Sequence, residues 1–97
     1  MIYFSHMHVD VRIFKLFIPH SNSLKAKRQV VRSATERIKN RFNASVVELS
    51  GNDVWQRADI GVAILSNDAA YPEEAMAEIE RMLAMNSDAL LTEVEKK

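Results

Sequence analysis

The sequence predicts an α+β domain of the ferredoxin-like, split βαβ type, with the order β-α-β-β-α-β. Two segments with apolar residues at helical spacing alternate with four segments rich in β-branched and apolar residues. The expected strands cover 8–18, 44–50, 57–66 and 89–95; the expected helices cover 23–42 and the stretch between polar turns at 67–68 and 86–88. Right-handed connections should place the first and third strands centrally in an antiparallel four-stranded sheet, with both helices on one face.

The first helix, 23–42, is strongly basic, with seven Lys or Arg residues and the single acid Glu36. Ser23 is suited to cap its first turn. The helix contains apolar residues at spacings of seven, three, four and four, which form one stripe: Leu24, Val31, Ala34, Ile38 and Phe42. The basic residues either form a solvated face or bind phosphate or an acidic partner. The candidate binding residues are Lys25, Lys27, Arg28, Arg32, Lys39 and Arg41.

Charge is divided along the chain although its formal total is zero. Residues 1–49 contain nine Lys or Arg against three Asp or Glu, a net charge of +6, whereas 50–97 contain four against ten, a net charge of −6. Because electrostatic attraction depends on the local potential, the zero total does not exclude a polyanionic partner.

The first strand, 8–18, has apolar residues at both odd-numbered and even-numbered positions, which point to opposite faces of a sheet. Either a bulge near Ile13 shifts the alternation, or both faces of the sheet are partly covered. Without a bulge, apolar residues would lie on the face that has no helices, and a second copy packing sheet to sheet is the simplest partner. The candidate dimer face comprises Val11, Ile13, Phe17, Ala63 and Leu65.

Several functional classes lack their usual residues. The 97 residues are expected to form one domain at 7–97, after an extension at 1–6 that is either loose or an upstream start before Met7. The chain has no cysteine, no signal-peptide pattern and no apolar run of about 20 residues, so a cytoplasmic protein is expected. A glycine-rich phosphate cradle is missing from 19–24. We expect neither an enzyme nor a cofactor.

Two smaller sites have competing interpretations. Trp55 could stack on a base with Arg57 on a phosphate, as accessory contacts, or Trp55 could close one end of the core. His6, His8 and Asp10 share one strand parity and could meet a metal, but two histidines so spaced recur by chance, and we predict no metal site.

The runs MHVDVRIFKLFIP, SLKAKRQVVRS, RIKNRFNASVVEL and WQRADIGVAILSNDAA together resemble the YlxP-like family of small bacterial proteins, over residues 7 to about 95. The resemblance implies a ferredoxin-like fold. Because family genes often lie beside genes for translation and ribosome-assembly factors, it also suggests RNA or ribosome association. This chain departs from the family pattern at Asp10 and at Pro72, and by its six-residue N-terminal extension. The family pattern falls on Ser23, Leu24, Lys25, Lys27, Arg28, Arg32, Asn40, Arg41, Phe42, Asn43, Trp55, Gln56, Arg57, Ser66, Asn67 and Asp68.

Two functional hypotheses remain. The first is a non-enzymatic protein that binds ribosomal RNA or the ribosome through the basic helix. The alternative is a homodimeric interaction module, or a small-ligand regulatory module, that uses the apolar sheet face.

Overall fold

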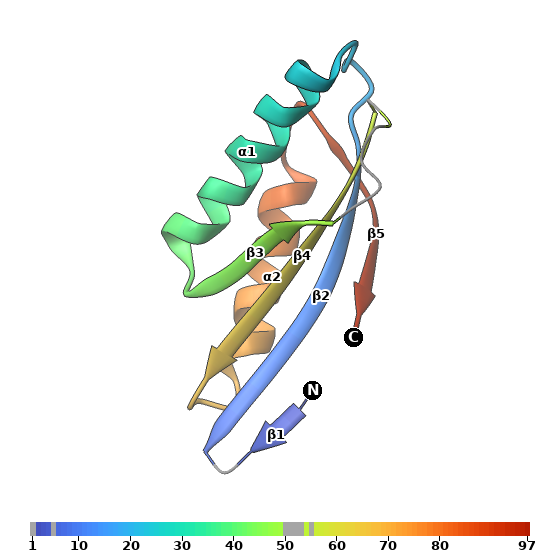
Figure 1. Cartoon of the computed structure of the whole chain (residues 1–97). Coiled ribbons are helices and arrows are strands. Elements are labelled where there is room, and N and C mark those ends of the chain that lie inside the picture. The colour runs from blue at the N-terminus through green and yellow to red at the C-terminus, as the bar shows by residue number, and fades with distance from the viewer. Residues whose placement is uncertain (1, 5, 50–53, 55) are drawn as a thin grey trace.

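The computed structural model describes residues 2–4, 6–49, 54 and 56–97. The elements in chain order are β1 (Ile2–Phe4), β2 (Met7–Phe17), α1 (Leu24–Arg41), β3 (Ala44–Glu48), β4 (Arg57–Ser66), α2 (Tyr71–Ala84) and β5 (Leu90–Lys96), as Figure 1 shows. From β2 onward this is the predicted β-α-β-β-α-β order. The expected α+β, ferredoxin-like fold is confirmed.

The sheet is antiparallel and is built around β2 and β4. β2 pairs with β4, and β3 pairs with the other side of β4, where it is an edge strand. Two strands share the other side of β2. β5 pairs with residues 12–17 of β2, and β1 pairs with residues 7–9 of β2. The extension at 1–6 therefore contributes a short strand, where the sequence had no clear strand pattern. Figure 1 shows β1 beside the end of β2 that β5 does not reach.

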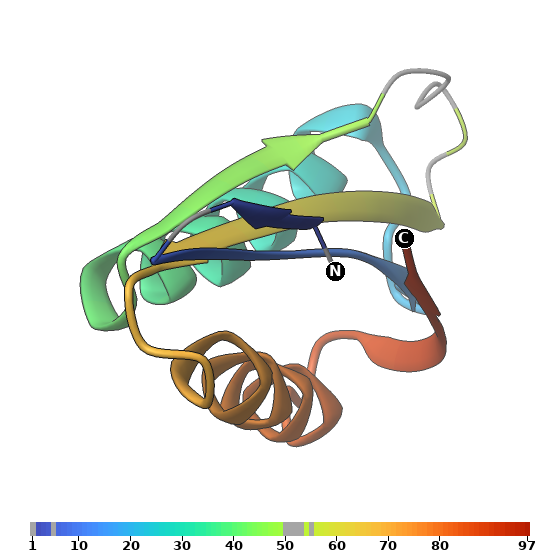
Figure 2. The same cartoon turned by 90° about the horizontal axis from the view of Figure 1, so that it is seen from below.

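Both helices cover the same face of the sheet, here called the inner face. The apolar residues of even number on β2 and β4, among them Phe14 and Ile60, are buried there and form one core cluster with Val31 of α1 and Ile79 of α2. In Figure 2, α2 lies to one side of β2 and β4. Each such buried side chain contributes about 1.5–3 kcal/mol relative to an exposed one, so this face dominates the stability of the fold.

Helix α1 begins as the sequence predicts. The Ser23 hydroxyl accepts a hydrogen bond from the Ala26 amide at 3.1 Å, which satisfies one of the amides that the first turn leaves unpaired. The helix ends at Arg41, and the Phe42 amide still donates to the Ile38 carbonyl at 2.9 Å. Its bounds fix the positions of the basic side chains of this helix along its axis.

The first strand has no bulge against its central neighbour. The pairing of β2 with β4 is continuous from His8 opposite Ser66 to Phe17 opposite Arg57. The one shift in register lies in the pairing with β5, between Lys15 and Leu16. Apolar residues of odd number on β2 therefore lie on the face without helices, here called the open face, and the alternative of a bulge near Ile13 is wrong.

Candidate functional site

Four of the six predicted basic residues form a single exposed row on α1. We call Lys25, Arg28, Arg32 and Lys39 the basic stripe; all four are exposed. At 100° per residue they occupy a sector of about 60°, and at 1.5 Å per residue they extend over about 21 Å. Within the part of the chain that the structure describes, none of the four forms an ion pair. The row is therefore strongly positive, and Glu36, four residues after Arg32 and three before Lys39, is the one acid of α1 near it.

Lys27 does not belong to this surface. Its side chain is 2% exposed, and its ammonium donates to the Val54 carbonyl at 3.0 Å and lies 3.6 Å from the Glu48 carboxylate. A buried charge is tolerated when it has such partners. Lys27 instead joins α1 to the end of β3 and to Val54, a placement that differs from the surface position expected from the sequence.

Arg41 lies on the opposite flank of α1 from the basic stripe. Its guanidinium is 3.7 Å from the Glu78 carboxylate of α2, and it also contacts the sulfur of Met82 and the ring of Phe42. The exposed pair with Glu78 is of a kind that contributes at most about 1 kcal/mol. Arg41 thus faces α2, and the six predicted residues divide into a row of four, a buried lysine and an arginine beside the second helix.

The basic stripe forms one wall of a groove between α1 and the edge strand β3. The groove has a volume of about 360 Å³ and is lined by Arg28, Val31, Arg32, Thr35, Lys39, Val46, Val47 and Glu48. Figure 1 shows α1 running beside β3 at this edge of the molecule. Val31 and Val46 supply apolar lining and the helix supplies the three cations, whereas Val47, opposite Gly61, has its side chain on the open face. We call this the α1–β3 groove.

The two predicted accessory residues have separate outcomes. Trp55 lies outside the described residues. Arg57 is exposed at the start of β4, opposite Phe17 and with odd parity, which places it on the open face rather than beside the basic stripe. The structure therefore does not bring Arg57 together with the cations of α1.

The open face contains the whole candidate dimer surface. Val11 is paired with Ala63, and Val9 is paired with Leu65, which is 52% exposed. Ile13 and Phe17 share the parity of Val11. The five predicted residues thus share one face, and no helix of the described chain covers them.

A charged row crosses the open face between Ile13 and Phe17. Lys15 lies opposite Asp59 on one side and opposite Glu93 on the other, and its ammonium is 2.7 Å from Glu95. The hydrogen bond from Lys15, together with a second from Lys97, lowers the pKa of Glu95 to about 2. The same bond to Glu95 and the charge of Glu93 raise the pKa of Lys15. On the open face the ion-pair network therefore separates Phe17 from Val11 and Ile13.

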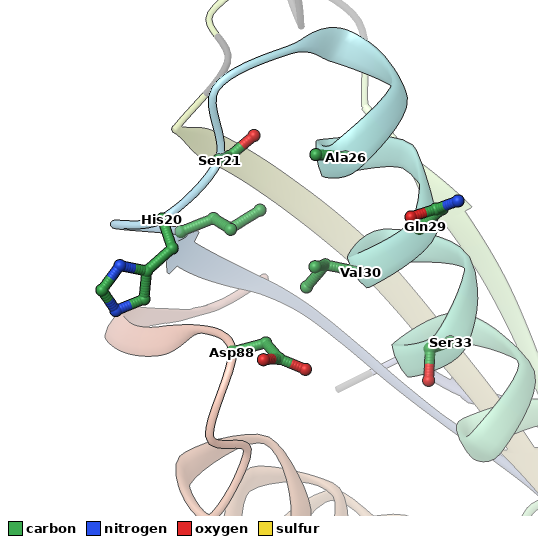
Figure 3. Close-up of a pocket in the computed structure, with 8 residues that line it drawn as sticks. His20, Ser21, Ala26, Gln29, Val30, Ser33 and Asp88 are labelled. Atoms are coloured by element: carbon green, nitrogen blue, oxygen red, sulfur yellow. The ribbon is translucent and has the colours of Figure 1, made fainter.

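A further pocket of about 350 Å³ lies between the first half of α1, the loop that precedes it, and the turn that leads into β5. Figure 3 shows the side chains of Val30 and Asp88 pointing into this space, with the ring of His20 at its rim. It holds serine, histidine and aspartate side chains, the residue types of a hydrolase triad. The Ser21 hydroxyl, however, donates to the Ser23 carbonyl at 3.1 Å, and within the described chain no hydrogen bond joins His20 to Asp88 or to a serine. No catalytic arrangement is formed there.

The described residues also contain no group of three His, Cys, Asp or Glu side chains that could hold a metal ion. Asp10, one member of the histidine-rich strand start, is 1% exposed and pairs with the Arg12 guanidinium at 3.1 and 3.2 Å. Among the described helices, none is long and apolar enough to cross a membrane.

Two ion pairs with a buried member, Lys27–Glu48 and Asp10–Arg12, were not predicted from the sequence. Lys27 lies within the apolar stripe of α1, at an angle between Ala34 and Ile38, which was a signal for burial, but Glu48 and Val54 are 21 and 27 residues further along the chain. Asp10 and Arg12 have even numbers, like the buried Phe14, so they lie on the same face of β2. This alternation was the signal in the sequence that they could pair on the inner face.

Fold and surface together define a small ferredoxin-like protein with an exposed basic helix and an apolar open face. Residues 9–96 match the model of a family described as protein of unknown function (DUF503). The chain is also 38% identical over 64 residues to the uncharacterized protein YlxP of Bacillus subtilis (strain 168), an alignment that covers 66% of each chain. The chain belongs to the DUF503 family, as the resemblance to YlxP-like proteins predicted.

Proposed function

We propose that the protein is a non-enzymatic binding protein that associates with RNA, ribosomal RNA above all, through the basic stripe of α1. The observation that carries the proposal is the stripe itself: four exposed cations in one row, without an ion pair in the described chain. Such a row contacts phosphates rather than base edges, so the binding is largely independent of sequence. The proposal includes a cytoplasmic location, because ribosomes are found there.

A solvated face is the competing explanation, and the arrangement of charge favours binding. A surface that serves solubility alone mixes both signs of charge. Three acids of the second half of the chain lie elsewhere: Glu78 faces the opposite flank of α1, and Glu93 and Glu95 lie on the open face. The four cations of the stripe outnumber Glu36, the one acid of α1, so the local potential along the stripe is positive.

The test is equilibrium binding of the purified protein to ribosomal particles and to a structured ribosomal RNA fragment at two salt concentrations. Four phosphate contacts give a slope of log affinity against log salt of about −2.8 for a single strand and about −3.6 for a duplex. Between about 50 and 200 mM salt, the affinity should therefore fall about 50- to 150-fold.

A double charge reversal, Arg28→Glu with Arg32→Glu, should abolish this binding. The matched control is Arg37→Glu with Lys96→Glu, which changes the net charge equally at two exposed positions away from the stripe. Binding that survives the first pair of substitutions, or that is lost equally with both pairs, would contradict the proposal.

The open face supports a second candidate function, a homodimer that packs sheet to sheet or a module that holds a small ligand there. The specific observation is the continuous register of β2 with β4, which leaves Val11, Ile13 and Leu65 without a helix above them. For the homodimer we expect Ile13→Asp to give a folded monomer by light scattering, with wild type as a dimer. A monomeric wild type, or a variant that still dimerises, would exclude this interface. The two functions are compatible, because the stripe lies on the other side of the sheet.

A further inference from the structure

We infer that the α1–β3 groove is a site for single-stranded RNA, with phosphates on the basic stripe and base edges on the free backbone of β3. This inference rests on the proposed function and names its substrate class. It depends on three features of the groove: the row of cations, the free strand edge, and the distance between successive cations.

The backbone of β3 has hydrogen-bonding groups that face the groove. The Leu49 amide donates to the Asp59 carbonyl of β4 at 2.9 Å. Because residues on an antiparallel edge strand alternate between facing the neighbouring strand and facing away, Val46 and Glu48 direct their N–H and C=O groups toward the free edge. Their neighbours Ser45 and Val47 direct theirs toward β4. β3 pairs with no strand of the described chain other than β4.

The opposite wall supplies charge at a spacing that suits one nucleic-acid strand. Arg28 and Arg32 are one helical turn apart, about 6 Å along the axis, and Lys39 follows about 10 Å further on. A basic groove that follows one backbone is a common way to bind single strands without sequence preference. The carboxylate of Glu48, which also lines the groove, lies 3.6 Å from the Lys27 ammonium, so its charge is compensated.

The occupant is a single strand rather than a duplex or a second copy of the chain. In a duplex the Watson–Crick edges are already paired, so β3 can reach only the phosphates, the 2′-hydroxyls and the base edges that the shallow minor groove exposes. A second copy joined edge to edge through β3 would set two basic stripes against each other, and the like charges would repel. An unpaired strand offers both the phosphates and the free donors and acceptors that the two walls require.

The experiment compares a single-stranded oligoribonucleotide of about twelve residues with an RNA hairpin of the same length at about 50 mM salt. Amide hydrogen exchange and amide chemical shifts are followed residue by residue. We expect the single strand to bind at least about tenfold more tightly, and to protect Val46 and Glu48 while Ser45 and Val47, already bonded to β4, change little. An acidic peptide of equal charge is titrated in parallel.

A variant isolates the backbone contact. Val46→Pro removes one amide donor at an edge position where proline is tolerated, and it leaves the stripe intact. It should weaken single-strand binding about two- to tenfold without changing hairpin affinity or the salt slope. The exchange experiment on the unaltered chain does not depend on the folding of this variant.

The outcomes separate the inference from the proposed function. Equal affinity for strand and hairpin, or binding without protection at Val46 and Glu48, would overturn the groove and leave the stripe as an RNA surface. Protection of the same amides by the acidic peptide but not by RNA would overturn RNA as the occupant. No binding of either RNA at low salt would overturn both.

Discussion

Replacement of Lys27 by methionine is expected to destabilise the protein and to leave RNA binding unchanged. Methionine keeps most of the aliphatic stem but removes the ammonium, which bonds to the Val54 carbonyl and lies near Glu48. Both partners reach water, because Val54 is 52% exposed and the Glu48 side chain is 27% exposed. The cost should therefore be about 1–2 kcal/mol, below the 3–5 kcal/mol typical of a fully buried pair that loses one member.

Replacement of Lys27 by alanine removes the packed stem as well, which adds the cost of a cavity and brings the loss to about 3–4 kcal/mol. For a domain of this size 1 kcal/mol shifts the melting temperature by about 4–8 °C. Thermal unfolding followed by circular dichroism should therefore show a drop of about 4–16 °C for Lys27→Met and a larger drop for Lys27→Ala.

The matched control is Lys25→Met, the same chemical change two residues earlier on the exposed stripe. It should change stability by less than about 0.5 kcal/mol, while it removes one phosphate contact and reduces the salt slope by about 0.7–0.9. Lys27→Met could instead weaken RNA binding as much as Lys25→Met and have the melting temperature of wild type. Lys27 would then be a surface cation, and its role in joining α1 to Val54 and Glu48 would be refuted.

Three further expectations follow from the other ion pairs and from the one described glycine. The pKa of Glu95 is held at about 2, below its ordinary 4.5, mainly by Lys15, so its stabilising effect is present above pH 4.5 and is lost as pH falls toward 2. The melting temperatures of Glu95→Gln and wild type should then converge near pH 2, and a constant difference would refute the linkage. Gly61→Ala should be tolerated and should raise stability by about 0.5–1 kcal/mol in denaturant titrations, because the added Cβ meets Val47 at 3.4 Å, an ordinary contact; destabilisation would show that the open face is too tightly packed there. Arg41→Ala should change RNA affinity less than twofold in the binding assay, since the guanidinium pairs with Glu78 beside α2; a loss like that of a stripe residue would enlarge the site.

The sequence predicted the fold because its strongest signals are local. The spacing of Val31, Ala34 and Ile38 and the cap at Ser23 define α1, and the alternation of Ala58 to Ile64 defines β4. The first strand was ambiguous because apolar residues lie on both of its faces, and only its pairing with β4 shows that the alternation is continuous. β1 was missed because three residues form a strand there only by pairing with β2.

The candidate site was predicted in part for the same reason. Helical geometry was sufficient to group Lys25, Arg28, Arg32 and Lys39, since residues on one helix have a fixed angular relation. The placement of Lys27 and Arg41 depends on contacts with β3 and α2, which are distant in sequence. The α1–β3 groove depends on which strand forms the edge of the sheet, a property of the assembled fold.

The division of charge gives the protein a preferred orientation toward a polyanion even though its formal charge is zero. The basic stripe lies on the β3 side of α1, whereas the flank of α1 at Arg41 meets α2 and its acid Glu78. A phosphate backbone is attracted to the first flank, whereas on the second flank Glu78 offsets the charge of Arg41, so approach along the α1–β3 groove is favoured over approach along α2. Because exposed charges are screened over about 8–10 Å at ordinary salt, the two flanks act separately at close range. A net charge of zero is therefore compatible with tight but salt-sensitive binding through one flank of one helix.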